Sequence, residues 1–340
     1  MPFIDDILKH KSLSIVGTEK NTGKTVCLNY ILKRLVEKNK IPAITSIGID
    51  GESLDQVTNT QKPEIELNYN SIFVTSEKHF ATKSIDAEIL DVSNRKTSLG
   101  RLITARAKSK GKLIFSGPPE TVWLKEVIKD LTLYKPDIVL VDGALSRKSF
   151  GSPSVTDSMI LTTGAALSAN MQTLVKKTAY LYDLIKLKQW KSDIADTLLG
   201  IESGLWAIDD SNNIHDLNIP SVFLLDKAVD NLLEYGNRLF ISGVINDKIL
   251  DKLRIQANID KTEIIVRDFT RIFAGQNSLN SFLDKGGKIK VLLKTNLMAV
   301  CVNPLAPNGF LLDSEKLRTL LNKKLNLPVY DIKKISSEEL

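Results

Sequence analysis

Nine residues near the N-terminus, GTEKNTGKT from Gly17 to Thr25, constrain the fold more than any other part of the sequence. A short apolar run at residues 13–17 leads into them, and apolar residues at helical spacing follow up to about residue 40. A second apolar run covers residues 41–49. Strand, loop, helix and strand in this order form the repeating unit of a parallel sheet covered by helices. The sequence therefore predicts an α/β fold with a mainly parallel sheet and helices on both faces.

The residue types of this loop suit the binding of phosphate groups. Glycines let backbone N–H groups converge on phosphate oxygens, and the helix that begins at Lys24 points its positive end at the same anion. Lys24 would reach the β- and γ-phosphates, and the Thr25 hydroxyl would bind Mg²⁺. The common pattern has four residues between its glycines, whereas five separate Gly17 from Gly23. A turn with an incidental Gly-Lys-Thr is the alternative.

The strand before the loop and the amphipathic helix after it favour a phosphate loop. We therefore expect a P-loop NTPase-like fold that binds a nucleoside triphosphate, with ATP and Mg²⁺ as the ligands. Lys24 is also a candidate catalytic residue. The residues expected to contact the nucleotide are Gly17, Thr18, Glu19, Lys20, Asn21, Thr22, Gly23, Lys24, Thr25 and Val26.

Acidic residues that follow apolar strands are candidates to bind the metal ion. Magnesium with a triphosphate needs one or two carboxylates at the carboxyl ends of neighbouring parallel strands. Asp142 follows the apolar run 137–141, and we expect it to bind the metal and to take part in hydrolysis. Asp50 follows the run 44–49 and is a second metal candidate, with Glu52 close by; an acidic turn explains this pair equally well.

Arg147 and Lys148 lie in the polar segment after Asp142. They would clamp a phosphate, hold a substrate or contact a partner, and a solvated loop explains them as well. Together with residues 63–116, the segment 144–156 is a candidate for partner contact by its position alone.

The rest of the chain alternates between strand and helix patterns. Residues 63–116 hold short apolar runs separated by Asn, Ser and Gly, which predicts a β-rich insertion in the α/β core. We place a nucleotide-binding domain at residues 1–230 and a C-terminal α/β domain or continuation at 231–340. Strands are expected at 137–141, 158–163, 221–225, 239–244, 263–266, 289–293 and 298–302, and helices at 121–133, from after residue 166 to about 191, at 246–257, 276–285 and 314–324.

Composition excludes several classes of protein. The formal net charge is +6 and the basic residues are spread along the chain, so we expect no nucleic-acid partner. Cys27 and Cys301 both lie in apolar runs, which indicates buried thiols in a reducing compartment. No apolar run reaches the length of a membrane span, and the N-terminus lacks the apolar core of a signal peptide. We therefore expect a soluble, cytoplasmic protein without membrane contact.

Three stretches resemble dethiobiotin synthetase. GTEKNTGKT has the five-residue spacing of the loop in that family, and Val141-Asp142-Gly143-Ala144 stands where the family carries Val-Glu-Gly-Ala with its metal-binding acid. The stretch 160–168, ILTTGAALS, is similar to a later strand–Gly–helix segment. Asn246 lies one residue out of register with the base-recognising position, so we assign it no such role. This resemblance implies ATP-dependent ligation of a small carboxylic acid.

Longer stretches resemble a second family, the P-loop accessory proteins that form a subunit of the reactivase of adenosylcobalamin-dependent lysine 5,6-aminomutase. They are SLSIVGTEKNTGKTVCLNYIL (12–32), ITSIGIDGE (44–52), residues 96–120, residues 141–168 and CVNPLAPNGF (301–310). The resemblance implies an ATP-hydrolysing helper for lysine degradation. Its partners would be the aminomutase and a companion ATPase subunit. It would exchange damaged cobalamin out of the stalled aminomutase.

Three functions remain open from the sequence. A helper NTPase would hydrolyse ATP slowly until a protein partner stimulates it. A ligase would turn over a small acid without a partner and would need basic residues such as Lys148 near the γ-phosphate. A nucleotide-binding scaffold would show no turnover, and an inert Asp142→Asn variant would favour it.

Overall fold

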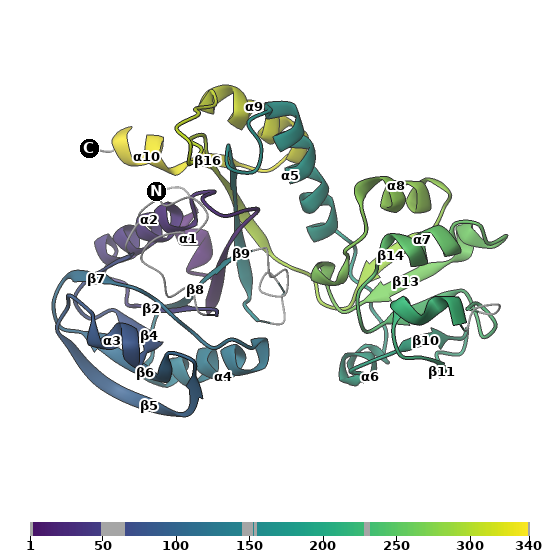
Figure 1. The fold of residues 1–340 in the computed structure, drawn as a ribbon, viewed down its shortest axis with the longest axis horizontal. Helices are drawn as coiled ribbons and strands as arrows, with labels where there is room; N and C mark the ends of the chain where they lie inside the picture. The colour runs from purple at the N-terminus through teal and green to yellow at the C-terminus, as the bar shows by residue number, and fades with distance from the viewer. Residues whose placement is uncertain (1–2, 49–64, 145–151, 153–154, 228–231, 339–340) are drawn as a thin grey trace. The chain divides into compact units, whose positions relative to one another are not determined.

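The computed structural model describes residues 3–48, 65–144, 152, 155–227 and 232–338 (Figure 1). The chain divides into two compact units. The first unit comprises Met1–Ala179 together with Asn296–Leu340, and the second comprises Tyr180–Thr295. The second unit is therefore a continuous segment inserted between two parts of the first.

A nine-stranded sheet forms the centre of the first unit, with the order β16-β15-β9-β1-β8-β2-β4-β6-β5. Neighbouring strands from β16 to β4 run parallel, and β6 pairs antiparallel with both β4 and β5. The strands are β1 (Ser12–Gly17), β2 (Pro42–Ser46), β4 (Ile72–Ser76), β5 (Ala87–Thr97), β6 (Gly100–Ala107), β8 (Ile138–Ala144), β9 (Ser158–Gly164), β15 (Leu297–Asn303) and β16 (Val329–Asp331). The expected α/β fold with a large, mainly parallel sheet is confirmed.

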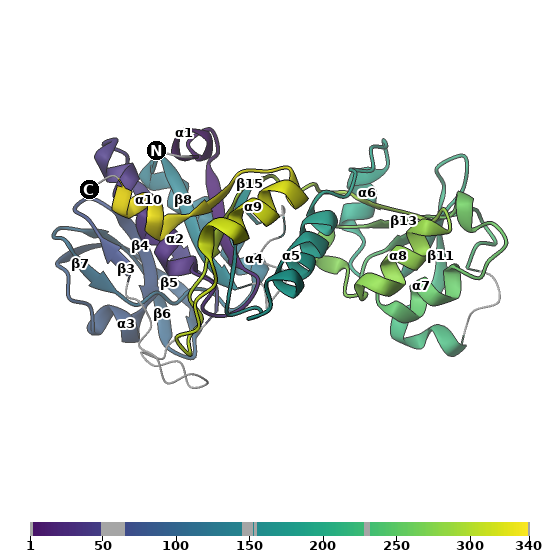
Figure 2. The same ribbon diagram turned by 90° about the horizontal axis from the view of Figure 1, so that it is seen from above.

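Helices cover both faces of this sheet (Figure 2). Apolar residues of α2 pack on one face, where Leu13, Ile15 and Leu140 are buried. Residues of α4 pack on the other face against Val139 and Val141, because successive strand residues point to opposite faces. The helices of the unit are α1 (Ile4–Ile7), α2 (Lys24–Glu37), α3 (Glu77–Ala81), α4 (Thr121–Leu131) with the 3₁₀ turn η1 (Thr132–Tyr134), the first part of α5 (Met171–Ile185), α9 (Ser314–Leu325) and α10 (Ile332–Glu338).

The sequence of α2 explains both its orientation and its length. Its buried apolar side chains recur at helical spacing and form one stripe: Cys27, Leu28, Ile31, Leu32 and Leu35. Asn39 adopts a left-handed conformation with φ 55°, and the Lys40 amide donates to the Leu35 carbonyl. Such a turn satisfies the last carbonyls of a helix and ends it. α2 is thereby fixed along the sheet with its first turn directly behind Gly23.

The second unit has its own five-stranded sheet, in the order β11-β10-β12-β13-β14. β12, β13 and β14 are parallel, and α7 and α8 connect them, which makes a β-α-β-α-β unit. Its core includes Trp190, Leu198, Phe240 and Ile265. The elements are α6 (Ala195–Gly200), β10 (Leu205–Ile208), β11 (Ile214–Ile219), η3 (Val222–Lys227), β12 (Arg238–Ile241), α7 (Asp247–Leu253), η4 (Ile259–Lys261), β13 (Glu263–Val266), η5 (Phe269–Arg271), α8 (Gln276–Asp284) and β14 (Lys288–Val291).

Several expected elements differ from those observed. In the stretch 63–116, expected to be a β-rich insertion, β4, β6 and β5 continue the main sheet, while β3 (Ile65–Leu67) and β7 (Gly111–Leu113) pair apart from it. The strand expected at 221–225 is the 3₁₀ segment η3. The helix expected from after residue 166 to about 191 is shorter, since α5 spans Met171–Ile185.

The expected domain boundary near residue 230 lies outside the described residues. The two compact units meet at Ala179/Tyr180 and at Thr295/Asn296. The last part of the chain therefore returns to the first sheet, where β15 pairs with β9.

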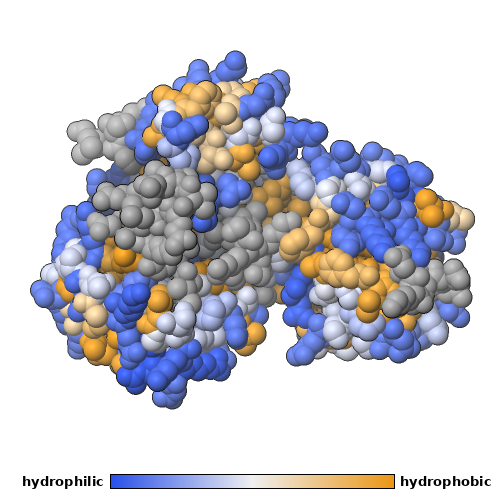
Figure 3. All heavy atoms as spheres, in the orientation of Figure 1, coloured by the Kyte–Doolittle hydropathy of each residue, from blue (hydrophilic) through white to orange (hydrophobic). Residues whose placement is uncertain are grey.

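Hydrophilic side chains dominate the face of the protein drawn in Figure 3, and apolar ones form smaller patches on it. Over the described part of the chain, no helix combines the length and apolar character needed to cross a membrane.

Candidate functional site

The loop from Gly17 to Thr25 lies at the carboxyl edge of the sheet, where the order of the strands reverses. β1 pairs with β8 on one side and with β9 on the other, and the chain continues from β1 through α2 to β2 on the far side of β8. In open α/β sheets, ligands bind at such a reversal point, outside the carboxyl ends of the strands. This position makes the loop the first candidate for a functional site.

Two glycines give the loop its shape. A Cβ on Gly17 would lie 2.5 Å from the Thr22 hydroxyl oxygen, 2.9 Å from Lys24 Nζ and 3.0 Å from the Glu19 carbonyl oxygen. The loop therefore folds closely over Gly17, and a side chain there would fill the space it encloses. Gly23 has φ 95°, a left-handed conformation that favours glycine, and it stands directly before the first residue of α2.

Threonines of β9 hold the loop from one side. The Thr18 amide donates to the Thr162 carbonyl over 2.8 Å, and its hydroxyl donates to Thr163 Oγ1 over 3.3 Å. The buried Thr22 hydroxyl lies 3.1 Å from Thr162 Oγ1 and also donates to the Glu19 carbonyl. These bonds fix both ends of the loop to the neighbouring strand, so its shape is set before any ligand binds.

Asn303, the last residue of β15, holds the loop from farther along the sheet. Its side-chain amide donates to the Asn21 carbonyl over 3.0 Å, and Asn21 has a left-handed φ of 59°. The Asn303 carbonyl accepts from the Ala165 amide, which fixes β15 to the end of β9. The loop near the N-terminus is thus held by a residue close to the C-terminus.

The start of α2 carries the features that attract an anion. Gly23 makes no side-chain cap, and the first turn of α2 holds no acidic residue. The first amides of a helix have no partner within the helix, and its dipole places positive charge there. Lys24 Nζ donates to the Glu19 carbonyl over 3.3 Å, so the lysine folds back across the loop. Thr25 lies in the same first turn and is partly exposed.

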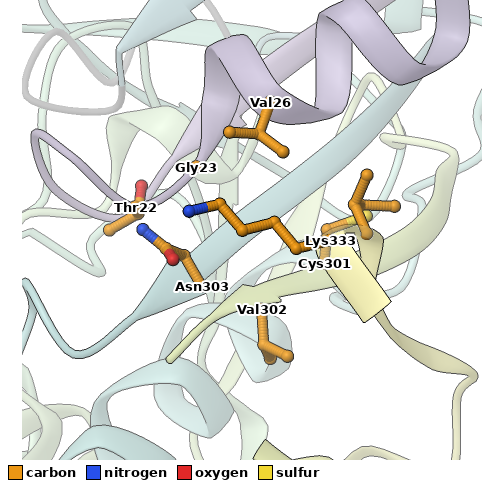
Figure 4. A pocket seen from close by; sticks show the side chains of 8 residues that line it. Thr22, Gly23, Val26, Cys301, Val302, Asn303 and Lys333 are labelled. Atoms are coloured by element: carbon orange, nitrogen blue, oxygen red, sulfur yellow. The ribbon is translucent and has the colours of Figure 1, made fainter. Parts of the chain in front are cut away.

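The other predicted loop residues differ in their surroundings. Glu19 and Lys20 are exposed, and the Lys20 amide donates to the Glu19 carboxylate over 3.0 Å. Thr18 is partly buried between the loop and β9. Val26 lines a small pocket with Thr22, Gly23 and residues of β15 and α10 (Figure 4). The ten predicted contact residues are consecutive in the sequence, and they extend from the end of β1 through the loop into the first turn of α2.

Asp142 lies on the face of the sheet that α2 covers. It pairs in register with Ile15 of β1 and with Ser46 of β2, and it has the same orientation as Leu140, which packs under α2. Its strand does not end at Val141 as expected but continues to Ala144, because β1 pairs with β8 up to Gly17. Asp142 is partly buried on the strand next to the loop.

The remaining predicted side chains cannot be placed beside it. Asp50, Glu52, Arg147 and Lys148 lie outside the described residues. In the described ranges, no group of three or more His, Cys, Asp or Glu side chains is arranged to hold a metal ion.

Cys27 and Cys301 lie side by side under the start of α2. Both are buried and free, and their sulfur atoms are 3.8 Å apart. Contact with the Cys27 thiol, together with burial, raises the pKa of the Cys301 thiol. The Cys301 thiol therefore remains neutral. Both side chains pack as apolar groups between α2 and β15.

Sequence reasoning missed the residues that hold the loop from outside it. Thr162 and Thr163 were recognised only as part of the stretch ILTTGAALS, and Asn303 had no assigned role. One signal was present: Thr-Gly at the end of β9 and Asn at the end of β15 both follow apolar strands, where the carboxyl ends of parallel strands meet. Strand order decides which of these ends lie next to the loop.

Comparisons of the chain with protein-family models, with curated proteins and with solved structures found no match.

Proposed function

We propose that the chain binds a nucleoside triphosphate, with its phosphates held by the loop from Gly17 to Thr25. The observation that carries the proposal is the loop itself: it closes over Gly17, where a Cβ would meet three loop atoms at 2.5 to 3.0 Å, and leads directly into an uncapped helix. Backbone amides, a helix start and a lysine around one glycine form a site for a polyphosphate. Its place at the strand-order reversal supports the same ligand.

We further propose ATP with Mg²⁺ as the form bound, and P-loop NTPase as the class of fold. Lys24 would bind the terminal phosphates, and the hydroxyl of Thr25 would bind Mg²⁺. Magnesium bound with a triphosphate keeps several waters and takes only one or two protein ligands. Asp142, on the strand beside the loop and on the same side as α2, fits the role of the second protein ligand, directly or through water.

The biological role that we propose is reactivation of an adenosylcobalamin-dependent lysine 5,6-aminomutase by ATP hydrolysis, together with a companion ATPase. This rests on the sequence resemblance of residues 12–32, 96–120, 141–168 and 301–310. A ligand that binds one of two conformations more tightly shifts the population toward it, so a nucleotide cycle can loosen the grip of an enzyme on a damaged cofactor.

Nucleotide binding is tested with Lys24→Ala, and Lys33→Ala, an exposed lysine of the same helix, serves as the control. We expect Lys24→Ala to weaken ATP binding about 100-fold or more, since charge-assisted hydrogen bonds to phosphate are lost. Lys33→Ala should bind as the unmodified protein does. ATP affinity within a few-fold of the unmodified protein in Lys24→Ala would refute the site.

The role of Asp142 in hydrolysis is tested with Asp142→Asn, and the proposed reactivation is tested by adding the aminomutase. Asp142→Asn should retain ATP binding and lose Mg²⁺-dependent turnover; unchanged turnover would remove Asp142 from the site. ATP turnover is then measured with and without an inactivated cobalamin-dependent aminomutase and its companion ATPase. Stimulated turnover with recovery of mutase activity supports reactivation, whereas turnover indifferent to the mutase favours a ligase acting on a small acid.

A further inference from the structure

The pocket beside the first turn of α2 joins two parts of the chain that are far apart in sequence. Thr22, Gly23 and Val26 line it from the loop and helix, and Asn303 and Lys333 line it from β15 and α10 (Figure 4). Cys301, Val302 and Ile332 form its remaining walls. The polar atoms of the pocket therefore gather at the end that faces the proposed phosphate loop.

Lys333 is held in place by its neighbours in the chain. The buried Asp331 accepts hydrogen bonds from the amides of Lys333 and Lys334, over 3.1 and 3.3 Å, which fixes the first turn of α10. Ile332 is 3 % exposed and packs in the same core cluster as α2. The backbone of Lys333 is thus anchored against α2 although its side chain is exposed.

The side chain of Lys333 extends along the pocket toward the loop, and its Nζ ends near Thr22, Gly23 and the side-chain amide of Asn303 (Figure 4). The next residue, Lys334, instead forms an ion pair with Glu315. Within the described residues, no carboxylate forms an ion pair with Lys333. Its charge is directed at the end of the loop beside Gly23, where the positive end of α2 lies, and two positive charges repel unless an anion is present.

We propose that Lys333 is a second phosphate-binding cation of the nucleotide site, contributed by the last helix of the chain. The inference rests on the proposed function and deepens it, because it assigns to the polyphosphate a binding residue outside the loop. Asn303 acts beside it as a positioning residue, since its amide bonds to the loop backbone at Asn21. The ligand chemistry is that of a di- or triphosphate, whose charge spreads over several oxygens and accepts more than one cation.

The test measures binding of ATP and of inorganic tripolyphosphate to the full chain and to Lys333→Gln, Lys333→Met and Lys333→Arg. We expect the affinity for both ligands to fall about tenfold in the Gln and Met variants and to stay near normal in the Arg variant. The loss should shrink at high ionic strength, because salt screens an exposed charge. Lys334→Gln, which removes an equal charge from the same helix, is the matched control and should bind normally.

The outcomes separate this inference from the proposed function. Binding of both ligands that is unchanged in Lys333→Gln and Lys333→Met, while Lys24→Ala abolishes it, refutes the role of Lys333 and leaves the loop intact. Lower affinity for ATP with normal affinity for tripolyphosphate also overturns the proposed phosphate contact, because Lys333 would then contact the nucleoside. If Lys24→Ala binds normally too, the nucleotide site itself fails. Thermal unfolding of each variant verifies that the fold is retained.

Discussion

At the scale of single residues, Gly17 leaves no room for a side chain under the loop of the candidate site. We expect Gly17→Ala to weaken ATP binding about tenfold or more, since the added methyl would occupy the space under the loop and displace Thr22 and Lys24. The overall fold should survive, because one of the close atoms belongs to the flexible end of a lysine. Isothermal titration with ATP, together with a thermal melt, makes the measurement.

Substitution of a second glycine shows whether the effect comes from the added methyl group itself or from its position under the loop. Gly200, at the end of α6, has no atom within 4 Å of an added Cβ, so Gly200→Ala should bind ATP normally. Equal affinity of Gly17→Ala and Gly200→Ala for ATP would show that no ligand uses the space over Gly17.

At the scale of elements, a half-buried tyrosine makes the stability of the second unit depend on pH. The hydroxyl of Tyr180, in α5, donates to the Ala274 carbonyl over 2.6 Å. Burial, followed by the charge of Asp247, raises the pKa of Tyr180 from 10.0 to about 12. A raised pKa in the folded state contributes stability that is complete below pH 10 and is lost as the pH rises toward 12, because only the unfolded chain then releases the proton.

We therefore expect the difference in melting temperature between the unmodified protein and Tyr180→Phe to fall between pH 10 and pH 12. The variant lacks the hydrogen bond to the Ala274 carbonyl at every pH, but it has no phenol to titrate. Tyr235→Phe, at a more exposed tyrosine of the same unit, controls for the loss of a phenol. A difference that stays constant across this range would show that the fold does not raise the pKa of Tyr180.

Elements could be predicted where burial, on one face of a helix or on both faces of a strand, dictates the sequence pattern. The stripe of α2 and the apolar runs of β1, β8 and β9 are visible in the sequence because each lies against the core. β5 was missed, since its residues are partly or fully exposed and show no regular alternation. The apolar run at 221–225 was mistaken for a strand, but Phe223 and Leu224 are exposed in a 3₁₀ turn.

The candidate site likewise contains residues that could be predicted from the sequence and residues that could not. Loop residues from Gly17 to Val26 are neighbours in sequence, so their grouping could be predicted from spacing alone. The order of the strands places β9 and β15 on the side of β1 away from β8. Only this order brings Thr162, Asn303 and Lys333 close to the loop. No local pattern encodes that order, because it follows from long-range packing of parallel strands.

At the scale of the whole molecule, the chain leaves the first unit after α5 begins and returns to it at β15. The second unit, Tyr180–Thr295, has its own five-stranded sheet and a core that includes Phe240, Ile265 and Phe282, all fully buried. A segment with its own core and sheet has the properties of a domain that folds by itself. Inserted domains of this kind are tolerated because their two ends enter at the surface of the host.

We expect residues 180–295, expressed alone, to fold cooperatively, since the parallel strands β12, β13 and β14 and their helices bury their apolar faces within the segment. Circular dichroism during heating should show one sharp transition, and Phe240→Ala should lower its midpoint by removing a fully buried ring. In the full chain, the same substitution should leave ATP binding unchanged below the melting temperature, because the loop belongs to the first unit together with Thr162 and Asn303, which hold it. A gradual transition of the fragment, or ATP affinity that falls with Phe240→Ala in the folded chain, would mean that the two units fold and bind as one.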